Sequence, residues 1–393
     1  MKMKIYIVFS LFIVVLISFG SQYCYGNQGG EEYIIKEVAL IPWGEEDSLL
    51  GFIPSSSGTN ELSGEDWFEP GEAVISWDIG LDGKIYVADG VKKRVSVYDS
   101  NGHYLRSIGI WNQKSDKITI KTTSGKEKTV YSNHPLKYDT LQHLSIPFSY
   151  KVYFDSPAGV AVDGNANVYI IPSLSAKYLM KFPPDGKLLE IIDQFGEYRP
   201  EDMKMGIGQV FSDAYGNVFV DVSLKRTYIF VKFNENGKII SITEKKIQPQ
   251  DAEGNLYDLL SSNKKWNERK SQISISVKHP KTIKEDTLTV HFGHPSSASF
   301  WRADGDGNLY FNVGWSVHKY DQQGNLLAII QGKHDTKRTL THPMAGMGKI
   351  SKLMANGDIY VAYMCDQGFV IVKQELQQET KGQILKPAVK PEK

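Results

Sequence analysis

The sequence predicts an all-β fold, a six-bladed β-propeller of four-stranded antiparallel blades. The first observation is a short sequence motif that recurs six times. In each copy a tight glycine or asparagine turn leads directly into a strand in which apolar positions alternate. The second is the spacing of the copies, 83, 50, 38, 53 and 50 residues, because self-similarity at such periods indicates a propeller or a solenoid. The third is a second turn within most copies, which makes each unit about four short strands long. The anchor positions of the six turns are Gly83, Ala166, Gly216, Gly254, Gly307 and Gly357.

The first unit shows how a blade is assembled. Residues 85–89 alternate, residues 95–99 alternate again after a short polar link, and Asn101-Gly102 leads into residues 104–108. Asn-Gly between alternating runs predicts a hairpin with a type I′ turn, which needs a positive φ at both central residues. Similar hairpin turns recur at Gly186, Gly237 and Gly324. A unit of this size cannot bury both of its faces, so we expect the units to stack radially against one another.

Two segments depart from the regular repeat. The fourth unit, around Gly254, has no recognisable Asn-Gly hairpin after its turn, so we expect a divergent blade there. Residues 33–40 have strand character and precede the first repeat. We expect this strand to complete the last blade, because closing the ring with strands from both ends of the chain removes an exposed sheet edge.

The strand patterns resemble those of the NHL-type six-bladed β-propeller over residues 70–373. The clearest inner strand is Gly159-Val160-Ala161-Val162-Asp163, and Arg94 stands where that family often has an arginine at the start of the third strand. The shared features also include the Gly-Asn turn and a third strand that ends in an apolar residue, an aromatic residue and Asp. The resemblance implies the fold, whereas fold alone does not define an activity.

The ends of the chain predict export and a polar tail. Lys2 and Lys4 precede an apolar stretch at residues 5–18, which indicates a secretory signal peptide at residues 1–26 and a secreted or periplasmic protein. Two other fates of this segment stay open, namely lipidation at Cys24 and an uncleaved membrane anchor. We assign residues 27–373 to the propeller and residues 374–393, rich in Gln, Lys, Glu and Pro, to a disordered polar tail.

Charge and cysteine content restrict the partners. The chain carries 45 basic and 45 acidic residues and no dense run of Lys and Arg. Nucleic acid and anionic membranes both need a concentrated positive field, so neither is expected as a partner beyond an N-terminal anchor. Removal of Cys24 with the signal would leave Cys365 alone, so stability is expected to come from the core rather than from a disulfide.

Long connections mark the expected binding face. Residues 110–156, 243–299 and 332–349 interrupt the repeats, and we expect all three insertions on the face opposite the glycine turns. The first contains an expected hairpin at Ser124-Gly125. Aromatic rings beside polar groups suit a glycan, peptide or protein ligand, although they also pack the core of an insertion. The candidate ligand-binding residues are Trp111, His134, Tyr138, Asp139, His143, Trp315, His334 and His342. Trp77 and Trp301, each six residues before an anchor glycine, are expected in the core.

The catalytic motifs of common enzymes are missing from the sequence. It has no His-Glu-x-x-His, Gly-x-Ser-x-Gly, Cys-x-x-Cys or phosphate-binding loop. Residues 304–308 imitate the start of a calcium loop, but Leu309 and Trp315 replace its glycine and glutamate, which favours a simple turn. We therefore expect no cofactor, and the leading hypothesis is a non-catalytic binding protein. A docking platform in a larger envelope assembly fits the same observations.

The alternative is a calcium- or zinc-dependent hydrolase or lyase with its metal at the centre of the ring. Its ligands would come from His134, His143, His294, His334 and His342, with Asp139 as a base. The inner strands offer few acidic or histidine residues near their starts, which counts against convergent metal ligands. Oligomeric state stays open.

Overall fold

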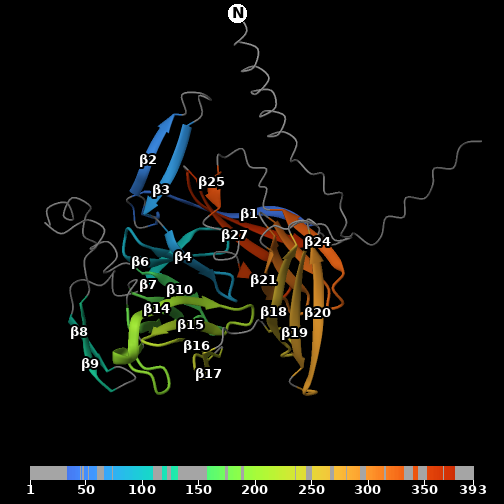
Figure 1. Cartoon of the computed structure of the whole chain (residues 1–393). Helices are drawn as coiled ribbons and strands as arrows, with labels where there is room; N and C mark the ends of the chain where they lie inside the picture. Colours follow the sequence, from blue (N-terminus) through green and yellow to red (C-terminus); the bar gives the residue numbers. More distant parts are fainter. Residues whose placement is uncertain are drawn as a thin grey trace, which may run out of the picture.

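The chain forms a six-bladed β-propeller, which confirms the predicted fold class (Figure 1). The computed structural model describes residues 33–376 except 45, 47, 52, 60–65, 73, 109–116, 122–124, 132–156, 173–175, 187–189, 235, 245–249, 266–269, 280, 293–297, 314–315, 332–339, 344–351 and 366. The expected signal peptide therefore lies outside the described residues. Within them, the helical element is the single 3-10 turn η2 (Pro200–Asp202), and no helix reaches the length and apolarity needed to cross a bilayer.

Blades 1 to 3 are regular four-stranded antiparallel sheets, ordered from the innermost to the outermost strand. Blade 1 contains β4 (Val74–Ile79), β5 (Ile85–Asp89), β6 (Arg94–Tyr98) and β7 (Tyr104–Ile108). Blade 2 contains β10 (Gly159–Val162), β11 (Val168–Ile171), β12 (Leu179–Phe182) and β13 (Glu190–Ile192). Blade 3 contains β14 (Met203–Ser212), β15 (Val218–Leu224), β16 (Tyr228–Phe233) and β17 (Ile239–Thr243).

Blades 4 to 6 complete the ring, and the fourth is divergent as predicted. Blade 4 contains β18 (Leu256–Lys265), β19 (Lys270–His279) and β20 (Lys284–Phe292). Blade 5 contains β21 (Ala298–Ala303), β22 (Leu309–Val313), β23 (Ser316–Tyr320) and β24 (Leu326–Gln331). Blade 6 contains β25 (Leu340–Pro343), β26 (Lys352–Leu353), β27 (Ile359–Cys365), β28 (Gly368–Leu376) and β1 (Tyr33–Pro42).

Among the described residues, blade 4 has three strands. An isolated antiparallel bridge between Gln250 and Leu256 lies at its inner position. Residues 243–299, expected as an insertion, are therefore mainly the three long strands of this blade.

The N-terminal strand closes the ring, as predicted for residues 33–40. β1 pairs antiparallel with β28, so the outermost strand of blade 6 comes from the opposite end of the chain (Figure 1). Gly368 allows this close pairing, because a Cβ at that position would lie 2.3 Å from the carbonyl oxygen of Ile41. Residues 374–376, expected in the polar tail, belong to β28, where they pair with Ile35, Ile34 and Tyr33.

The glycine turns gather on one face of the ring, as predicted. Backbone N–H groups donate to carbonyls of the neighbouring turn, from Gly164 to Gly216 at 3.0 Å and from Gly305 to Ala355 at 2.8 Å. Turns between third and fourth strands lie on the same face, because Asn165 Nδ2 donates to Asn236 Oδ1 at 2.9 Å. Inner strands therefore end at this turn face and begin at the opposite one.

The turn type predicted for the Asn-Gly hairpins is wrong. Gly102 has a φ of 83°, but Asn101 is not among the residues with positive φ. The ladder shifts register between Val97 and Tyr98, so the loop combines an ordinary turn with a glycine bulge rather than a type I′ turn. Asp99 stabilises it by accepting the N–H of Asn101 at 2.8 Å.

Apolar clusters hold most neighbouring blades together. Five clusters of buried residues join blades 1 and 2, 2 and 3, 4 and 5, 5 and 6, and 6 and 1. None of the five spans blades 3 and 4. Among the described residues of that interface, Lys232 Nζ donates to Gln250 Oε1 at 3.0 Å.

Two hairpins stand outside the blades. β2 (Ile53–Thr59) pairs with β3 (Asp66–Glu72), and β8 (Lys117–Lys121) pairs with β9 (Glu127–Tyr131) (Figure 1). The second confirms the hairpin expected at Ser124-Gly125, with a φ of 82° at Gly125. Each hairpin lies between the outermost strand of one blade and the inner strand of the next, where the chain crosses the face opposite the turns.

A partly buried histidine makes the fold sensitive to acid. Burial lowers the pKa of His318 on β23 to about 4, and its ring packs against Phe292 and Tyr320. The unfolded chain, with an ordinary histidine pKa of about 6.5, binds this proton first, so the contribution of His318 to stability is complete above pH 6.5 and is lost between pH 6.5 and 4. We expect that loss to be about 2–3 kcal/mol.

Urea unfolding of wild type and His318→Phe at pH 7, 5.5 and 4.5 measures this loss. The variant should lose less stability than wild type on acidification, whereas His291→Gln, at an exposed position on β20, should follow wild type. Parallel pH profiles for wild type and His318→Phe would contradict the assignment.

Candidate functional site

The structure describes little of the predicted ligand-binding set. Trp111, His134, Tyr138, Asp139, His143, Trp315 and His334 lie outside the described residues, as does His294 of the proposed metal ligands. The backbone of His342 lies in β25 opposite Met364. These residues remain sequence predictions.

The two tryptophans expected in the core pack there. Trp77 is buried, with its ring 6.2 Å from that of Phe369. Trp301 is partly buried and lies edge-on to Tyr310 at 6.5 Å. Neither contributes an exposed aromatic surface for a ligand.

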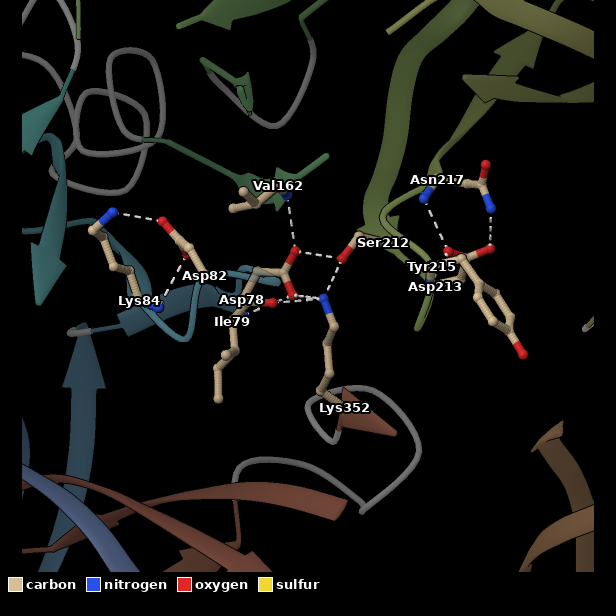
Figure 2. Close-up of polar contacts among 10 residues, drawn as sticks. All are labelled: Asp78, Ile79, Asp82, Lys84, Val162, Ser212, Asp213, Tyr215, Asn217 and Lys352. Carbon is tan, nitrogen blue, oxygen red and sulfur yellow. Dashed lines mark hydrogen bonds and ion pairs between the residues drawn. The ribbon is translucent and has the colours of Figure 1, made fainter. Parts of the chain in front are cut away.

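A buried ion pair occupies the centre of the ring near the turn face (Figure 2). Asp78 comes from the inner strand β4 of blade 1, and Lys352 comes from β26 of blade 6. Lys352 Nζ lies 2.7 Å from Asp78 Oδ1 and 2.8 Å from the carbonyl oxygen of Ile79. The two side chains are 8% and 6% exposed, so water screens their attraction poorly.

Two further blades join this pair (Figure 2). Ser212, the last residue of β14, donates from Oγ to Asp78 Oδ2 at 2.6 Å and accepts a hydrogen bond from Lys352 Nζ. The backbone N–H of Val162, the last residue of β10, donates to the same carboxylate oxygen at 2.9 Å. The network therefore links blades 1, 2, 3 and 6. It also gives the Val162 N–H, on the inner edge of blade 2, a hydrogen-bond acceptor.

The network shows that the inner strands run in one direction. Asp78, Val162, Ser212 and Lys352 all stand within a few residues of the turn that follows their strand, and they meet at one level. The starts of the inner strands, which the blade-to-blade connections enter, therefore lie toward the other face. β2–β3 and β8–β9 belong to such connections, and β8–β9 is the described part of residues 110–156.

Sequence reasoning missed this central layer, although its signal is present in the repeat. Asp78, Phe211, Arg302 and Lys352 each stand five residues before the anchor glycine of their unit. One position of the repeat thus carries a carboxylate, an aromatic ring, a guanidinium and an ammonium. Alignment of the six units on their turns would have identified charged residues at a position otherwise expected to be apolar.

Arg302 is the other cation of this layer. A β-bulge shifts the register of β21 between Phe300 and Arg302, and the guanidinium carbon lies 5.3 Å from the centre of the Phe211 ring on blade 3. Burial lowers the pKa of Arg302, while Asp213 and Asp78 act in the opposite direction. The side chain retains partial exposure to solvent.

The hydrogen-bonding capacity of the ion pair is used within the network. The three hydrogens of the Lys352 ammonium match its three acceptors, on Asp78, Ile79 and Ser212. The Asp78 carboxylate accepts four hydrogen bonds, the fourth from the N–H of Ile79 at 2.8 Å. Both groups are therefore suited to holding the ring together, and neither has capacity left to activate a nucleophile or a water molecule.

The aspartates of the turns are also engaged. Asp304 accepts the N–H groups of Asp306 and Asn308, the amide of Asn308 and the hydroxyl of Tyr310, at 2.9–3.0 Å. This confirms that residues 304–308 form a turn rather than a calcium loop. Asp163 and Asp251 anchor their turns with the same set of donors, including Tyr169 and Tyr257.

Metal coordination has little support in this part of the molecule. Within the described ranges, no group of three or more His, Cys, Asp or Glu side chains is arranged to hold a metal ion. The central layer carries the cations Lys352 and Arg302, and each of them repels a divalent cation.

Comparison with known proteins adds no assignment of activity. No protein-family model and no curated protein matches the chain. A catalytically inactive virginiamycin B lyase from Staphylococcus aureus, solved with quinupristin, is 13% identical over 88% of this chain and 100% of the lyase, with a TM-score of 0.34. A gluconolactonase from Xanthomonas campestris is 11% identical over 88% of this chain and 100% of the gluconolactonase, with a TM-score of 0.35. The calcium-binding protein regucalcin from Agrobacterium tumefaciens is 9% identical over 76% of this chain and 88% of regucalcin, also with a TM-score of 0.35.

Proposed function

We propose that the protein is an extracytoplasmic, non-catalytic binding propeller that recognises a protein, peptide or glycan on the face opposite its glycine turns. The observation that carries the proposal is where the chain adds structure beyond the blades. β2–β3 and β8–β9 are both inserted between an outer strand and the next inner strand, and β3 contacts β25 near the same connections. The turns on the other face are short.

The β8–β9 hairpin is held against the ring. Lys126 Nζ lies 3.6 Å from Glu201 Oε2 of η2, and β8 contacts β13 of blade 2. η2 itself connects blades 2 and 3 on this face. A hairpin that contacts the ring at its edge is well placed for recognition, in keeping with the frequent placement of binding residues on connections over a rigid scaffold.

The saturated Asp78–Lys352 pair favours binding over catalysis. Lys352 and Asp78 have their hydrogen bonds within the molecule, and a general base needs a free site within reach of its substrate. Export through residues 1–26 is part of the proposal and rests on the sequence pattern of that segment.

Glycan and peptide arrays probed with the purified chain test the proposal. Replacement of residues 117–131 by a short Gly-Ser linker should reduce binding of a captured ligand at least tenfold, because it removes the docked hairpin. A matched turn-face variant, Asn101→Lys with Gln323→Lys, changes two exposed residues and should bind like wild type. Equal affinity of wild type and the hairpin variant, or loss confined to the turn-face variant, would contradict the binding face.

The metal-dependent alternative has its own test, because its proposed ligands lie mainly outside the described residues. Elemental analysis and titration with Ca²⁺ and Zn²⁺ should show no stoichiometric binding if the proposal is correct. One equivalent of tightly bound metal that is lost on His134→Ala and His143→Ala would favour the hydrolase or lyase instead.

A further inference from the structure

The Arg302 guanidinium has no hydrogen-bond acceptor among the residues that the structure describes. Its contact there is with the face of Phe211, at 5.3 Å from the ring centre. Phe211 in turn stacks on Phe219 with ring centres 5.2 Å apart and planes 13° apart. Arg302 therefore lies on a rigid aromatic platform that belongs to blade 3, although the arginine itself belongs to blade 5.

This contact holds the guanidinium carbon over the Phe211 ring and uses none of its hydrogens. The five N–H groups of a guanidinium lie in its plane in a fixed fork. Such a fork matches the two oxygens of a carboxylate in a bidentate pair. The bulge in β21 between Phe300 and Arg302 directs the side chain into this position, and bulges commonly re-aim side chains beside binding sites.

The nearby carboxylates do not supply the missing acceptor. Asp78 and Asp213 attract Arg302 through space. The oxygens of Asp78 receive Lys352, Ser212 and two backbone N–H groups. Those of Asp213 receive the backbone N–H groups of Tyr215 and Asn217 and the Asn217 amide. Neither carboxylate forms an ion pair with Arg302, so the guanidinium keeps its donors for another group.

The charges around the site disfavour a strongly charged anion. Asp78 and Asp213 balance the charges of Arg302 and Lys352, so the attraction for an anion comes from the unoccupied donors of the guanidinium. Both carboxylates repel a dianion such as phosphate more than they repel a carboxylate. Burial lowers the pKa of Arg302, and the residue nevertheless keeps partial contact with solvent.

We propose that Arg302, on the Phe211 platform, is a carboxylate-binding site at the centre of the ring. The carboxylate belongs either to an acidic sugar or to the C-terminus of a peptide, two sources of the same chemistry. The site lies toward the turn face and stands apart from the proposed binding face. Its test is therefore independent of the β8–β9 hairpin.

Matched pairs of probes test the site by calorimetry on the full chain. Glucuronate is compared with glucose, acetyl-Ala-Ala with its C-terminal amide, and inorganic phosphate is added separately. We expect binding of at least one carboxylate probe, no binding of its neutral partner, and weaker binding of phosphate. Arg302→Gln should weaken carboxylate binding at least tenfold, and Arg302→Lys should restore part of it, because lysine keeps the charge without the fork.

Two controls keep the result interpretable. Arg226→Gln, at an exposed arginine after β15, should bind like wild type, and removal of residues 117–131 should leave carboxylate binding unchanged. If Arg302→Gln fails to fold, the Arg302 side-chain Nε resonance of the wild-type protein should still shift on adding glucuronate or acetyl-Ala-Ala. No response to either probe at about 20 mM, equal binding by Arg302→Gln and wild type, or tighter binding of phosphate would each overturn the proposal.

Discussion

Replacing Lys352 with methionine is expected to destabilise the protein by about 3–5 kcal/mol, the usual cost of leaving one partner of a buried ion pair unpaired. The substitution removes the ammonium that Asp78, Ile79 and Ser212 share, while Asp78 stays buried with its charge. Equilibrium unfolding in urea at pH 7 measures the change in the free energy of unfolding.

A double-mutant cycle separates the pair from the packing around it. Asp78→Asn with Lys352→Met removes both charges, so the double variant should be more stable than the sum of the single effects predicts, by about 1–3 kcal/mol. Lys84→Met is the matched control, because Lys84 pairs with Asp82 at 2.6 Å but is 40% exposed. It should cost less than about 1 kcal/mol. A small effect of Lys352→Met, or strict additivity in the cycle, would show that the network does not hold the ring.

Ile41→Asp should be at least as damaging, with a loss of more than about 4 kcal/mol and poor recovery of soluble protein. Ile41 on β1 is fully buried, in the cluster that joins blade 6 to Trp77, Ile79 and Val87 of blade 1. An unpaired carboxylate there opposes burial of β1 and so opposes closure of the ring.

Thermal unfolding and native-state hydrogen exchange of β28 amides measure this loss. Lys36→Gln is the control on the same strand, because Lys36 pairs with Glu375 at a position where its side chain is 57% exposed. It should unfold within about 1 kcal/mol of wild type. Wild-type protection of β28 in Ile41→Asp would mean that the ring closes without β1.

The sequence was sufficient to predict the blades because local chemistry repeats in each of them. Residues 85–89 and 104–108 were predicted as strands and form β5 and β7, since alternating β-branched and aromatic residues between glycine turns leave few other conformations. The strand at residues 33–40 was placed in the last blade for a similar reason, because its partner edge would otherwise be exposed.

Contacts between residues of different repeats, and details of backbone register, could not be predicted from the sequence. Asp78 and Lys352 stand 274 positions apart, and their pairing follows from the ring rather than from either local sequence. The three-stranded form of blade 4 and the bulge that follows Asn101 depend on backbone register, which a pattern of apolar residues does not determine. The candidate ligand-binding residues lie mainly in connections, where sequence alternation carries no structural information.

The pairing of β1 with β28 affects how the chain is made. Tyr33 is synthesised 343 residues before its partner Leu376. At about 5–20 residues per second, the first strand waits for tens of seconds without its neighbour. The ring is thus expected to close only once β28 has been synthesised, and a nascent chain halted before residue 368 should remain open and susceptible to proteases.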